Sequence, residues 1–338
     1  MPQIHKNFSL KNLNTFGVEA FSTWYTEINT EQELSDLFAD EKWKLGNKLV
    51  LGGGSNMLFT RDFDGLVIKM NIRGINYKET NENILVQAGA GEIWHNLVMY
   101  CVEQGFAGLE NLSLIPGSVG ASPIQNIGAY GVELKDTFYS CRAFEISTGK
   151  MRVFDQEECK FGYRDSLFKT AVKGQYIITE VTFKLSRITD FNTSYGAIEQ
   201  ELQKRGISNP SLKDISDVVA NIRVSKLPDP STIGNAGSFF KNPIISFTKF
   251  RQLQSTFPDI VHFLLPDDQV KLAAGWLIEQ CGWKGKVAGH TGTWINQALV
   301  LVNHGGATGK EVFSFSEEII SSVKSRFNIL LEREVNII

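Results

Sequence analysis

The sequence predicts a protein of the mixed α/β (α+β) class that contains two or three domains. Short apolar runs of strand length recur along the chain, and segments with helical periodicity lie between them. The chain of 338 residues also exceeds the size of about 250–300 residues beyond which single hydrophobic cores rarely grow. With 42% hydrophobic and 21% charged residues, the composition is typical of a folded, globular chain.

The first part of the chain has the pattern strand, helix, strand, strand. Phe21–Ile28 is rich in aromatic and apolar residues, which predicts a strand. Thr30 and Glu33 have the spacing of a capping box, so we expect a helix to begin there. Lys48–Leu51 predicts a short buried strand and Gly65–Met70 the next one. These elements indicate a small α/β domain.

The next part of the chain predicts further strands around one helix. Ile84–Ala88 predicts a strand. A helix follows, because apolar residues recur at positions i, i+3, i+4, i+7 and i+8 from Trp94. The later strands are expected at Phe138–Ser147, Met151–Phe154 and Tyr176–Leu185.

Between the helix and these later strands, Gly108–Gly131 lacks both helical and strand periodicity. Loops of this length in a compact protein are usually either functional or disordered. The segment is too apolar for disorder, because leucine and isoleucine recur among its glycines, prolines, serines and asparagines. We therefore expect a buried loop that wraps around a bound molecule.

Beyond Asp214 the pattern becomes more helical. Ile215–Val224 predicts a helix that ends at Lys226–Pro230, where two prolines mark a domain boundary. Lys271–Cys281 predicts an amphipathic helix closed by Gly282. A strand, a helix and an extended run complete the chain at Ala298–Val302, Glu311–Arg326 and Asn328–Val335.

Charge and composition argue against several classes of protein. The 34 basic residues nearly balance the 37 acidic ones, which gives no electrostatic case for nucleic acid or an anionic membrane. No signal peptide and no apolar run of membrane-spanning length is present, so we expect a cytoplasmic protein. The four cysteines and five histidines are scattered without the spacing of metal ligands, and we expect neither a metal site nor disulfides.

Three glycine-rich loops can offer backbone N–H groups to a phosphate: Leu51–Asn56, Ile115–Pro123 and Asn126–Gly131. The first has neither the lysine of a Walker A loop nor the spacing of a dinucleotide-binding fingerprint. Together the loops can line an elongated ligand that has both a diphosphate and a flat ring. The alternative is that they are three unrelated turns.

Seven motifs appear in one order along the chain: Asn14–Gly17, Gly54–Asn56, Ile115–Gly117, Gln125–Gly131, Gly162–Ser166, Gly234–Pro243 and Leu331–Val335. In this order they resemble the UDP-N-acetylenolpyruvoylglucosamine reductase (MurB) family over essentially the whole chain, and in particular the subclass that carries a segment around Tyr195. The Gly234–Pro243 run is the most specific of them. Arg333 stands where the family often has proline.

The resemblance implies an FAD-binding fold of the vanillyl-alcohol-oxidase type, with two lobes and a third α/β domain that binds the substrate. The expected lobes are residues 1–70 and 71–226, with 328–338 returning to the flavin, and the third domain is residues 227–327. It also implies that NADPH reduces a noncovalently bound FAD, through which UDP-N-acetylglucosamine enolpyruvate becomes UDP-N-acetylmuramate in peptidoglycan precursor synthesis. A monomer is expected.

The same resemblance implies which residues contact the flavin and the substrate. The expected FAD contacts are Gly53, Gly54, Ser55, Asn56, Met57, Ile115, Pro116, Gly117, Ser122, Pro123, Asn126, Ile127, Gly128 and Gly131. The expected substrate contacts are Tyr195, Arg223, Lys226, Asn242 and Gln297. Each substrate contact has a plain alternative as a solvated polar side chain.

Three residues match the catalytic positions of the family. Arg164, a permanent cation, would stabilise the charge that develops toward the substrate carboxylate; its alternative is a structural ion pair. Ser238 would donate a proton to carbon, although a serine beside glycine more often stabilises a turn. Glu334 would assist Arg164 as a protonated carboxyl group, which requires a raised pKa; its alternative is an exposed charge near a frayed terminus.

Two other functions fit parts of the pattern. A flavin-dependent oxidase would share the FAD loops, but Tyr195, the Gly234–Pro243 run and the pair Arg164 and Glu334 belong to the substrate site. A non-catalytic nucleotide-sugar binder would not need Arg164, Ser238 and Glu334 together. The sequence therefore favours the reductase.

Overall fold

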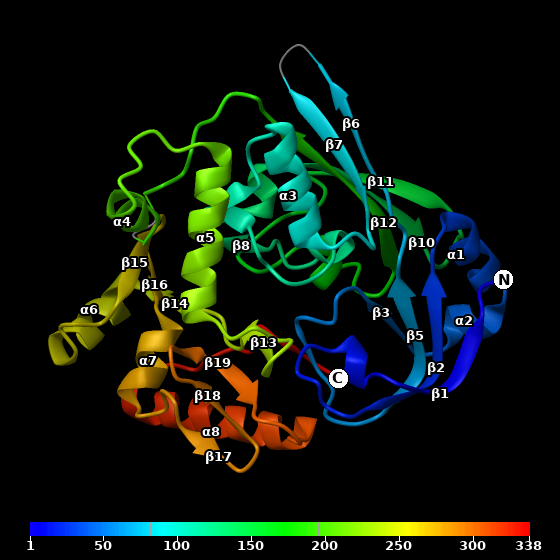
Figure 1. The fold of residues 1–338 in the computed structure, drawn as a ribbon. Coiled ribbons are helices and arrows are strands. Elements are labelled where there is room, and N and C mark those ends of the chain that lie inside the picture. Colours follow the sequence, from blue (N-terminus) through cyan, green and yellow to red (C-terminus); the bar gives the residue numbers. More distant parts are fainter. Residues whose placement is uncertain (81–82, 195–196) are drawn as a thin grey trace. The chain divides into compact units, whose positions relative to one another are not determined.

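A computed structural model describes residues 1–80, 83–194 and 197–338, and the chain divides into two compact units (Figure 1). Unit 1 consists of Met1–Phe8, Ser22–Gly54 and Phe63–Val224. Unit 2 consists of Ser9–Phe21, Ser55–Asp62 and Ser225–Ile338.

The first sheet of unit 1 has the strand order β1-β2-β5-β3. Its strands are β1 (Ile4–Ser9), β2 (Phe21–Ile28), β5 (Phe63–Met70) and β3 (Lys48–Leu51). The strands β2, β5 and β3 are parallel. Helices α1 (Glu31–Phe38) and α2 (Glu41–Leu45) follow β2 in the chain, and their buried residues join those of the strands in one core.

The predicted start of α1 is confirmed, but its capping is one-sided. The Thr30 side chain accepts a hydrogen bond from the Glu33 N–H, as the sequence predicts. The Glu33 carboxylate accepts from the N–H of Asn29 rather than from that of Thr30. The Glu33 carboxylate therefore bonds to the residue before the N-cap, whereas in a regular capping box it bonds to the N-cap residue itself.

The second sheet of unit 1 is antiparallel along β11-β10-β12-β7-β6. Its strands are β6 (Ile75–Glu79), β7 (Ile84–Gly89), β10 (Phe138–Glu145), β11 (Met151–Asp155) and β12 (Tyr176–Leu185). The helices are α3 (Trp94–Gln104), α4 (Ala197–Lys204) and α5 (Leu212–Lys226). The apolar face predicted from Trp94 is buried, and α3 ends at Gly105 with φ of 72°.

The leucine, isoleucine and valine side chains of the long loop before β10 are buried or half-buried, as predicted. Leu109, Leu112 and Val119 are at most 1% exposed. The loop contains two short 3-10 turns, Glu110–Leu112 and Val119–Ala121, and a hairpin of β8 (Gly128–Ala129) with β9 (Val132–Glu133). The two turn residues of the hairpin, Tyr130 and Gly131, both have positive φ, as a type I′ turn requires.

Unit 2 has two sheets of more than two strands. One has the order β13-β19-β18-β17 and the other β14-β16-β15. The strands are β13 (Gly234–Ser238), β14 (Ile244–Ser246), β15 (His262–Leu265), β16 (Gln269–Leu272), β17 (Val287–Ala288), β18 (Thr291–Trp294) and β19 (Gln297–Asn303). The helices are α6 (Phe247–Thr256), α7 (Ala274–Gln280) and α8 (Gly309–Phe327), and β4 (Met57–Leu58) pairs with β20 (Asn336–Ile337).

The helix predicted over Lys271–Cys281 is wrong at its start. The backbone is still strand β16 through Leu272, and α7 begins at Ala274. Burial alternates along β16, with Val270 and Leu272 inside, so the period of two takes precedence over the helical spacing there. The predicted closing glycine, Gly282, has φ of 77°.

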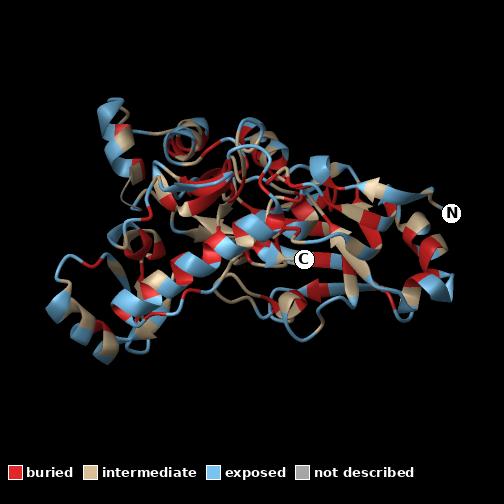
Figure 2. Cartoon of the chain, turned by 90° about the horizontal axis from the view of Figure 1, so that it is seen from below, coloured by how far each residue is buried: buried red, intermediate tan, exposed pale blue. Residues whose placement is uncertain are grey.

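Several strands of the structure were not indicated by the sequence, and β1 and β6 are two of them. Both lie at the edge of a sheet. Most of their residues are exposed, so they lack the alternation of apolar residues by which strands are recognised. By contrast, buried residues recur along one face of the longer helices, which Figure 2 shows as red between blue.

Candidate functional site

The first glycine-rich loop of unit 1 lies against the second, backbone to backbone. A Cβ atom on Gly53 would lie 2.7 Å from the Cα atom of Gly117. A Cβ atom on Gly52 would lie 2.3 Å from the side-chain oxygen of Ser118. Only glycine permits this approach, which explains why Gly52 and Gly53 occur where the backbones of the two loops are in contact.

The two loops have the features expected of a phosphate-binding cradle. No acidic side chain occurs in residues 51–56 or 115–123. The Ser118 hydroxyl is buried and has no hydrogen-bond partner within the protein. Buried polar groups are nearly always satisfied, so this hydroxyl is a suitable contact for a bound molecule. The donor set therefore fits a flavin dinucleotide.

A buried lysine supports the first loop. The Lys69 ammonium group donates a hydrogen bond to the carbonyl oxygen of Gly52. Burial lowers the pKa of Lys69, and the nearby Arg73 acts in the same direction. The loop thus has a cation on one of its carbonyl groups, and this positive charge favours an anion bound nearby.

Asn126 is completely buried, and its side chain connects two loops of unit 1. The amide nitrogen donates to Glu133 and to the Gly162 carbonyl oxygen, both at 3.0 Å. The amide oxygen accepts from the Lys135 N–H. These bonds indicate a supporting role for the Asn126 side chain, whereas the sequence suggested a direct FAD contact.

The other predicted FAD contacts fall into two groups. Three of them, Gly53, Pro116 and Gly131, are exposed. Ser122 is buried, and its hydroxyl donates to the Val119 carbonyl oxygen. The remaining ones are buried or half-buried: Gly54, Ser55, Asn56, Met57, Ile115, Gly117, Pro123, Ile127 and Gly128. Of these, Ser55, Asn56 and Met57 belong to unit 2.

Arg164 occupies a tight turn of unit 1. The N–H and carbonyl groups of Gly162 and Asp165 bond to each other across this turn. Arg164 has φ of 54°, a conformation that favours glycine and is costly for other residues. Its guanidinium donates to the Gly128 carbonyl oxygen at 2.6 Å, and its own carbonyl oxygen accepts from Lys169. Such backbone strain is typical of functional positions.

Ser238 lies at the end of β13 in unit 2, directly after an irregularity of the strand. The pairing of β13 with β19 shifts between Asn235 and Ser238, and Gly237 has φ of 66°. The Asn235 side chain is buried and accepts from the Gly237 N–H at 2.9 Å. Bulges of this kind are common beside active sites, where they change the direction of a side chain. The glycine of this motif permits such a bulge before Ser238.

Glu334 is brought to β13 by the last segment of the chain. Its N–H donates to the carbonyl oxygen of Phe239 at 2.9 Å, and its own carbonyl oxygen accepts from the Asn56 side chain. The residue is half-buried. Glu334 is therefore held on both sides of its backbone, and the alternative of a frayed, exposed terminus is wrong.

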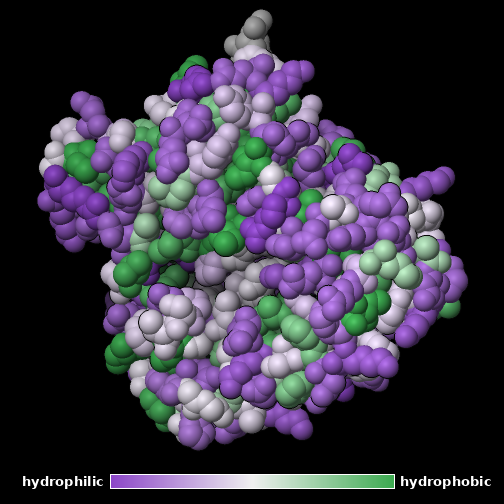
Figure 3. Space-filling model, turned by 45° about the vertical axis from the view of Figure 1, so that its right-hand side comes forward, coloured by the Kyte–Doolittle hydropathy of each residue, from purple (hydrophilic) through white to green (hydrophobic). Residues whose placement is uncertain are grey.

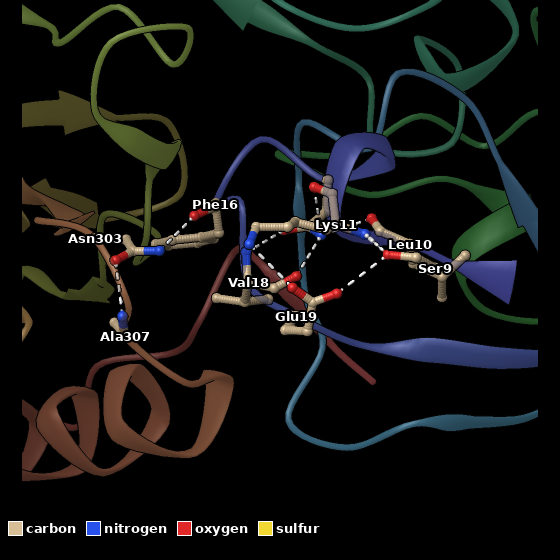
Figure 4. Close-up of polar contacts among 9 residues, drawn as sticks. Ser9, Leu10, Lys11, Phe16, Val18, Glu19, Asn303 and Ala307 are labelled. Atoms are coloured by element: carbon tan, nitrogen blue, oxygen red, sulfur yellow. Dashed lines mark hydrogen bonds and ion pairs between the residues drawn. The ribbon is translucent and has the colours of Figure 1, made fainter.

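The motif Asn14–Gly17 supports strand β13 of unit 2. Figure 4 shows the bonds of Asn303 to Phe16 and Ala307 in this region. The buried Asn14 side chain bonds to the backbone of Leu10 and Val18. Asn303 donates to the Phe16 carbonyl oxygen at 2.8 Å and accepts from the Ala307 N–H. The Thr15 carbonyl oxygen accepts from the N–H of Asn235. Sequence reasoning recognised this motif without assigning it a role, and the structure makes it a support for β13.

The predicted substrate contacts lie in different surroundings. Tyr195 lies outside the described residues. Arg223 is half-buried and donates from Nε to the Leu114 carbonyl oxygen, whereas Lys226 is exposed at the end of α5. Asn242 accepts from the first N–H of α7, and the Gln297 amide oxygen lies 2.7 Å from where a Cβ of Gly275 would be. The structure thus brings Asn242 and Gln297 to the start of one helix.

The described part of the chain contains no group of three or more His, Cys, Asp or Glu side chains that could hold a metal ion. Within the same residues, no helix has the length and hydropathy needed to cross a membrane.

On the face drawn in Figure 3, hydrophilic residues predominate and hydrophobic ones form small groups among them. Single exposed apolar side chains are normal on protein surfaces.

Comparison with known proteins gives matches over the whole chain. A family model described as an FAD binding domain matches residues 24–155. A second, described as UDP-N-acetylenolpyruvoylglucosamine reductase, C-terminal domain, matches residues 229–338. A MurB crystal structure from Thermus caldophilus has 24% sequence identity and a TM-score of 0.70, covering 100% of this chain and 99% of that one, which shows a shared fold.

Two curated relatives are similar along their full length. A UDP-N-acetylenolpyruvoylglucosamine reductase of Flavobacterium johnsoniae is 50% identical over 338 residues, which is 99% of this chain and 100% of the relative. The protein of the same name from Amoebophilus asiaticus is 50% identical over 336 residues, 99% of each chain. Identity at this level over whole chains establishes a common family.

Proposed function

The chain belongs to the UDP-N-acetylenolpyruvoylglucosamine reductase family, and we propose that Arg164, Ser238 and Glu334 perform its chemistry. The protein is an FAD-dependent oxidoreductase that reduces UDP-N-acetylglucosamine enolpyruvate to UDP-N-acetylmuramate in peptidoglycan precursor synthesis, with NADPH as electron donor. The observation that carries this function is the full-length similarity to reductases of that name.

Bound FAD supplies the hydride, which no side chain can provide. In unit 1 we assign its diphosphate to the loops around Gly53 and Gly117, because their backbones approach each other and the buried Ser118 hydroxyl has no protein partner. The three-domain division into 1–70, 71–226 with 328–338, and 227–327 remains part of this proposal.

We assign to Arg164 the carboxylate of the enolpyruvyl group. A guanidinium keeps its charge at every physiological pH and binds a carboxylate in fixed geometry. The hydrogen bond from Arg164 to the Gly128 carbonyl oxygen fixes one edge of the guanidinium. An ordered cation of this kind stabilises charge as it develops, because it need not reorganise during the reaction.

Ser238 then donates the proton to the carbon next to the carboxylate. Its position after the Gly237 bulge, with buried phenylalanines following it, supports a hydroxyl held in one orientation. A hydroxyl is a weak acid in water, so the role needs a pre-organised site that excludes water. Glu334 assists Arg164 in stabilising the enolic charge.

The remaining assignments concern substrate recognition and cellular context. We assign Tyr195, Arg223, Lys226, Asn242 and Gln297 to the sugar nucleotide. A cytoplasmic enzyme is expected from the scattered cysteines, which fit a reducing compartment. A monomer is the expected oligomeric state.

An anaerobic absorbance titration tests the function. NADPH is added to the purified holoenzyme, followed by UDP-N-acetylglucosamine enolpyruvate, while the flavin band is recorded. Bleaching by NADPH and recovery with the nucleotide establish donor, cofactor and acceptor together. Bleaching without recovery would refute the substrate, and a colourless protein that binds no added FAD would refute the flavin.

A further inference from the structure

The start of helix α3 holds the whole loop that leads into Gly117. The Trp94 indole donates to the Leu112 carbonyl oxygen at 2.9 Å. The backbone N–H of Trp94 donates to the Gly117 carbonyl oxygen at 3.1 Å. Ile93 pairs with Ser118 in an isolated antiparallel bridge. The position of this loop therefore depends on one helical turn of unit 1.

Leu114 is the strained residue of that loop. It has φ of 58°, although its Cβ disfavours the left-handed region. Two side chains hold its backbone in this state. Its N–H donates to Nδ1 of His95 at 3.0 Å, and its carbonyl oxygen accepts from Nε of Arg223 at 3.2 Å. The first comes from α3 and the second from α5, so both peptide groups beside Leu114 are fixed.

His95 can perform this task only while Nδ1 carries no proton. Burial lowers the pKa of His95, and the positive charge of Arg223 on α5 lowers it further. The neutral imidazole, protonated at Nε2, is therefore the form that accepts the Leu114 N–H. Protonation of Nδ1 would replace an acceptor by a donor and place two cations beside Leu114.

We propose that His95 is a positioning residue for FAD: its neutral imidazole holds Leu114 in the left-handed conformation and so keeps the Ile115–Gly117 turn against Gly53. Without this acceptor, Leu114 relaxes toward negative φ, which turns the following peptides away from the Gly53 loop. The inference rests on the proposed role of these two loops in FAD binding. Sequence reasoning placed His95 on a helix and gave it no function.

Two substitutions separate the acceptor from the rest of the side chain. His95→Leu keeps the approximate size of the side chain and removes the acceptor. His95→Asn places an amide oxygen close to the position of Nδ1 and does not titrate. The dissociation constant of FAD is measured by titrating each apoprotein and recording flavin fluorescence, with thermal melting to verify folding.

We expect FAD to bind roughly tenfold more weakly to His95→Leu, the effect of one lost hydrogen bond, and near-normally to His95→Asn. The inference is overturned if His95→Leu binds FAD as tightly as the wild type, or if both variants weaken binding equally. Should His95→Leu not fold, the pH profile decides. Wild-type affinity should fall in acid below the ordinary histidine pKa of about 6.5, and His95→Asn should lack this fall; a fall that persists in His95→Asn refutes the inference.

A second variant distinguishes failure of the inference from failure of its premise. Gly53→Ala introduces a Cβ against Gly117 and disturbs the same loops without touching His95. Weaker FAD binding in Gly53→Ala together with normal binding in His95→Leu overturns the role of His95 alone. Normal binding in both variants overturns the assignment of these loops to FAD as well.

Discussion

The backbone N–H of Glu334 donates a hydrogen bond to the carbonyl oxygen of Phe239, 2.9 Å away. The two residues lie near opposite ends of the segment Ser225–Ile338. This bond continues the bridge between Phe240 and Arg333. Glu334 thus lies opposite Phe239, the residue that follows Ser238. Two of the three proposed catalytic residues are thus placed by one antiparallel contact within unit 2.

Ser238→Ala should separate the two half-reactions. Reduction of the flavin by NADPH does not need a proton on the substrate carbon, so its rate should stay normal. Reoxidation by UDP-N-acetylglucosamine enolpyruvate should slow by about 10²–10³, the usual cost of one lost transition-state donor. Anaerobic stopped-flow absorbance of the flavin measures each step by itself.

Ser321→Ala is the matched control for this variant, because Ser321 is an exposed serine on α8 in the same unit. Its two half-reactions should match those of the wild type. Equal slowing of both half-reactions in Ser238→Ala would remove Ser238 from the proton-donor role.

Gly53→Ala should weaken FAD binding because the new Cβ would lie 2.7 Å from the Cα atom of Gly117. Separating two packed backbones costs about 1–3 kcal/mol, which corresponds to roughly tenfold or more in the dissociation constant. Fluorescence titration of the apoprotein with FAD measures this change.

Gly174→Ala provides the comparison for Gly53→Ala. Gly174 has φ of 74°, and a Cβ there would meet no atom within 4 Å. That variant should lose about 1 kcal/mol of stability through backbone strain and bind FAD normally. If both glycine variants weakened FAD binding alike, general destabilisation would explain the result and the cradle would not.

Much of the fold could be predicted because its central elements carry periodic burial. Phe21–Ile28, Lys48–Leu51 and Tyr176–Leu185 are strands with the predicted bounds. The edge strands β1 and β6 have exposed side chains, so no apolar pattern marks them. Lys271 and Leu272 belong to the short strand β16, which directly precedes helix α7. The apolar spacing there also fits a helix, so the predicted helix began too early in the sequence.

The candidate site was predictable only where its residues belong to ordered motifs. Gly53 and Gly117 were recognisable because close backbone contact demands glycine. His95 was not, since its partner is the N–H of Leu114, nineteen positions along the chain, and no sequence pattern specifies such a bond. The supporting role of Asn126 was hidden for the same reason: its partners Glu133, Lys135 and Gly162 lie 7, 9 and 36 positions along the chain.

Arg333→Ala should loosen the segment that carries Glu334. Nε of Arg333 donates to the Ser316 hydroxyl at 2.9 Å, its guanidinium pairs with Glu317, and it lies over the Phe313 ring. Losing these contacts to α8 should cost about 1.5–3 kcal/mol, the range of hydrogen bonds to charged groups. Reoxidation of the flavin by substrate should slow more than its reduction by NADPH, because only the former uses Glu334.

Lys324→Ala removes an exposed cation from the same helix and should leave both half-reactions unchanged. Thermal melting and stopped-flow absorbance test the pair of variants. Arg333→Ala with normal stability and normal reoxidation would show that the contacts with α8 do not hold the terminal segment in its working position.

Asn126→Ala should be strongly destabilising. The substitution removes the acceptor of the Lys135 N–H and leaves the Gly162 carbonyl oxygen with the Asp165 N–H as its donor. It also puts alanine at φ of 45°, where asparagine is better tolerated. The three hydrogen bonds that are lost contribute about 0.5–1.5 kcal/mol each, so a total loss of roughly 3 kcal/mol is expected in urea unfolding. A loss below about 1 kcal/mol would contradict the supporting role.

Asn126→Asp makes the same contacts dependent on pH. The new side chain can still accept from Lys135, but its second oxygen faces the Glu133 carboxylate and the Gly162 carbonyl oxygen. Burial and these neighbours raise the pKa of the introduced carboxyl group above its unfolded value of about 3.9. The folded state then binds more protons than the unfolded state, so stability falls as pH rises between the two pKa values. Unfolding in urea should therefore show a larger loss at pH 8 than at pH 5, whereas Asn126→Ala should lose the same amount at both; equal losses for Asn126→Asp would mean that its side chain has turned away from Glu133 and Gly162.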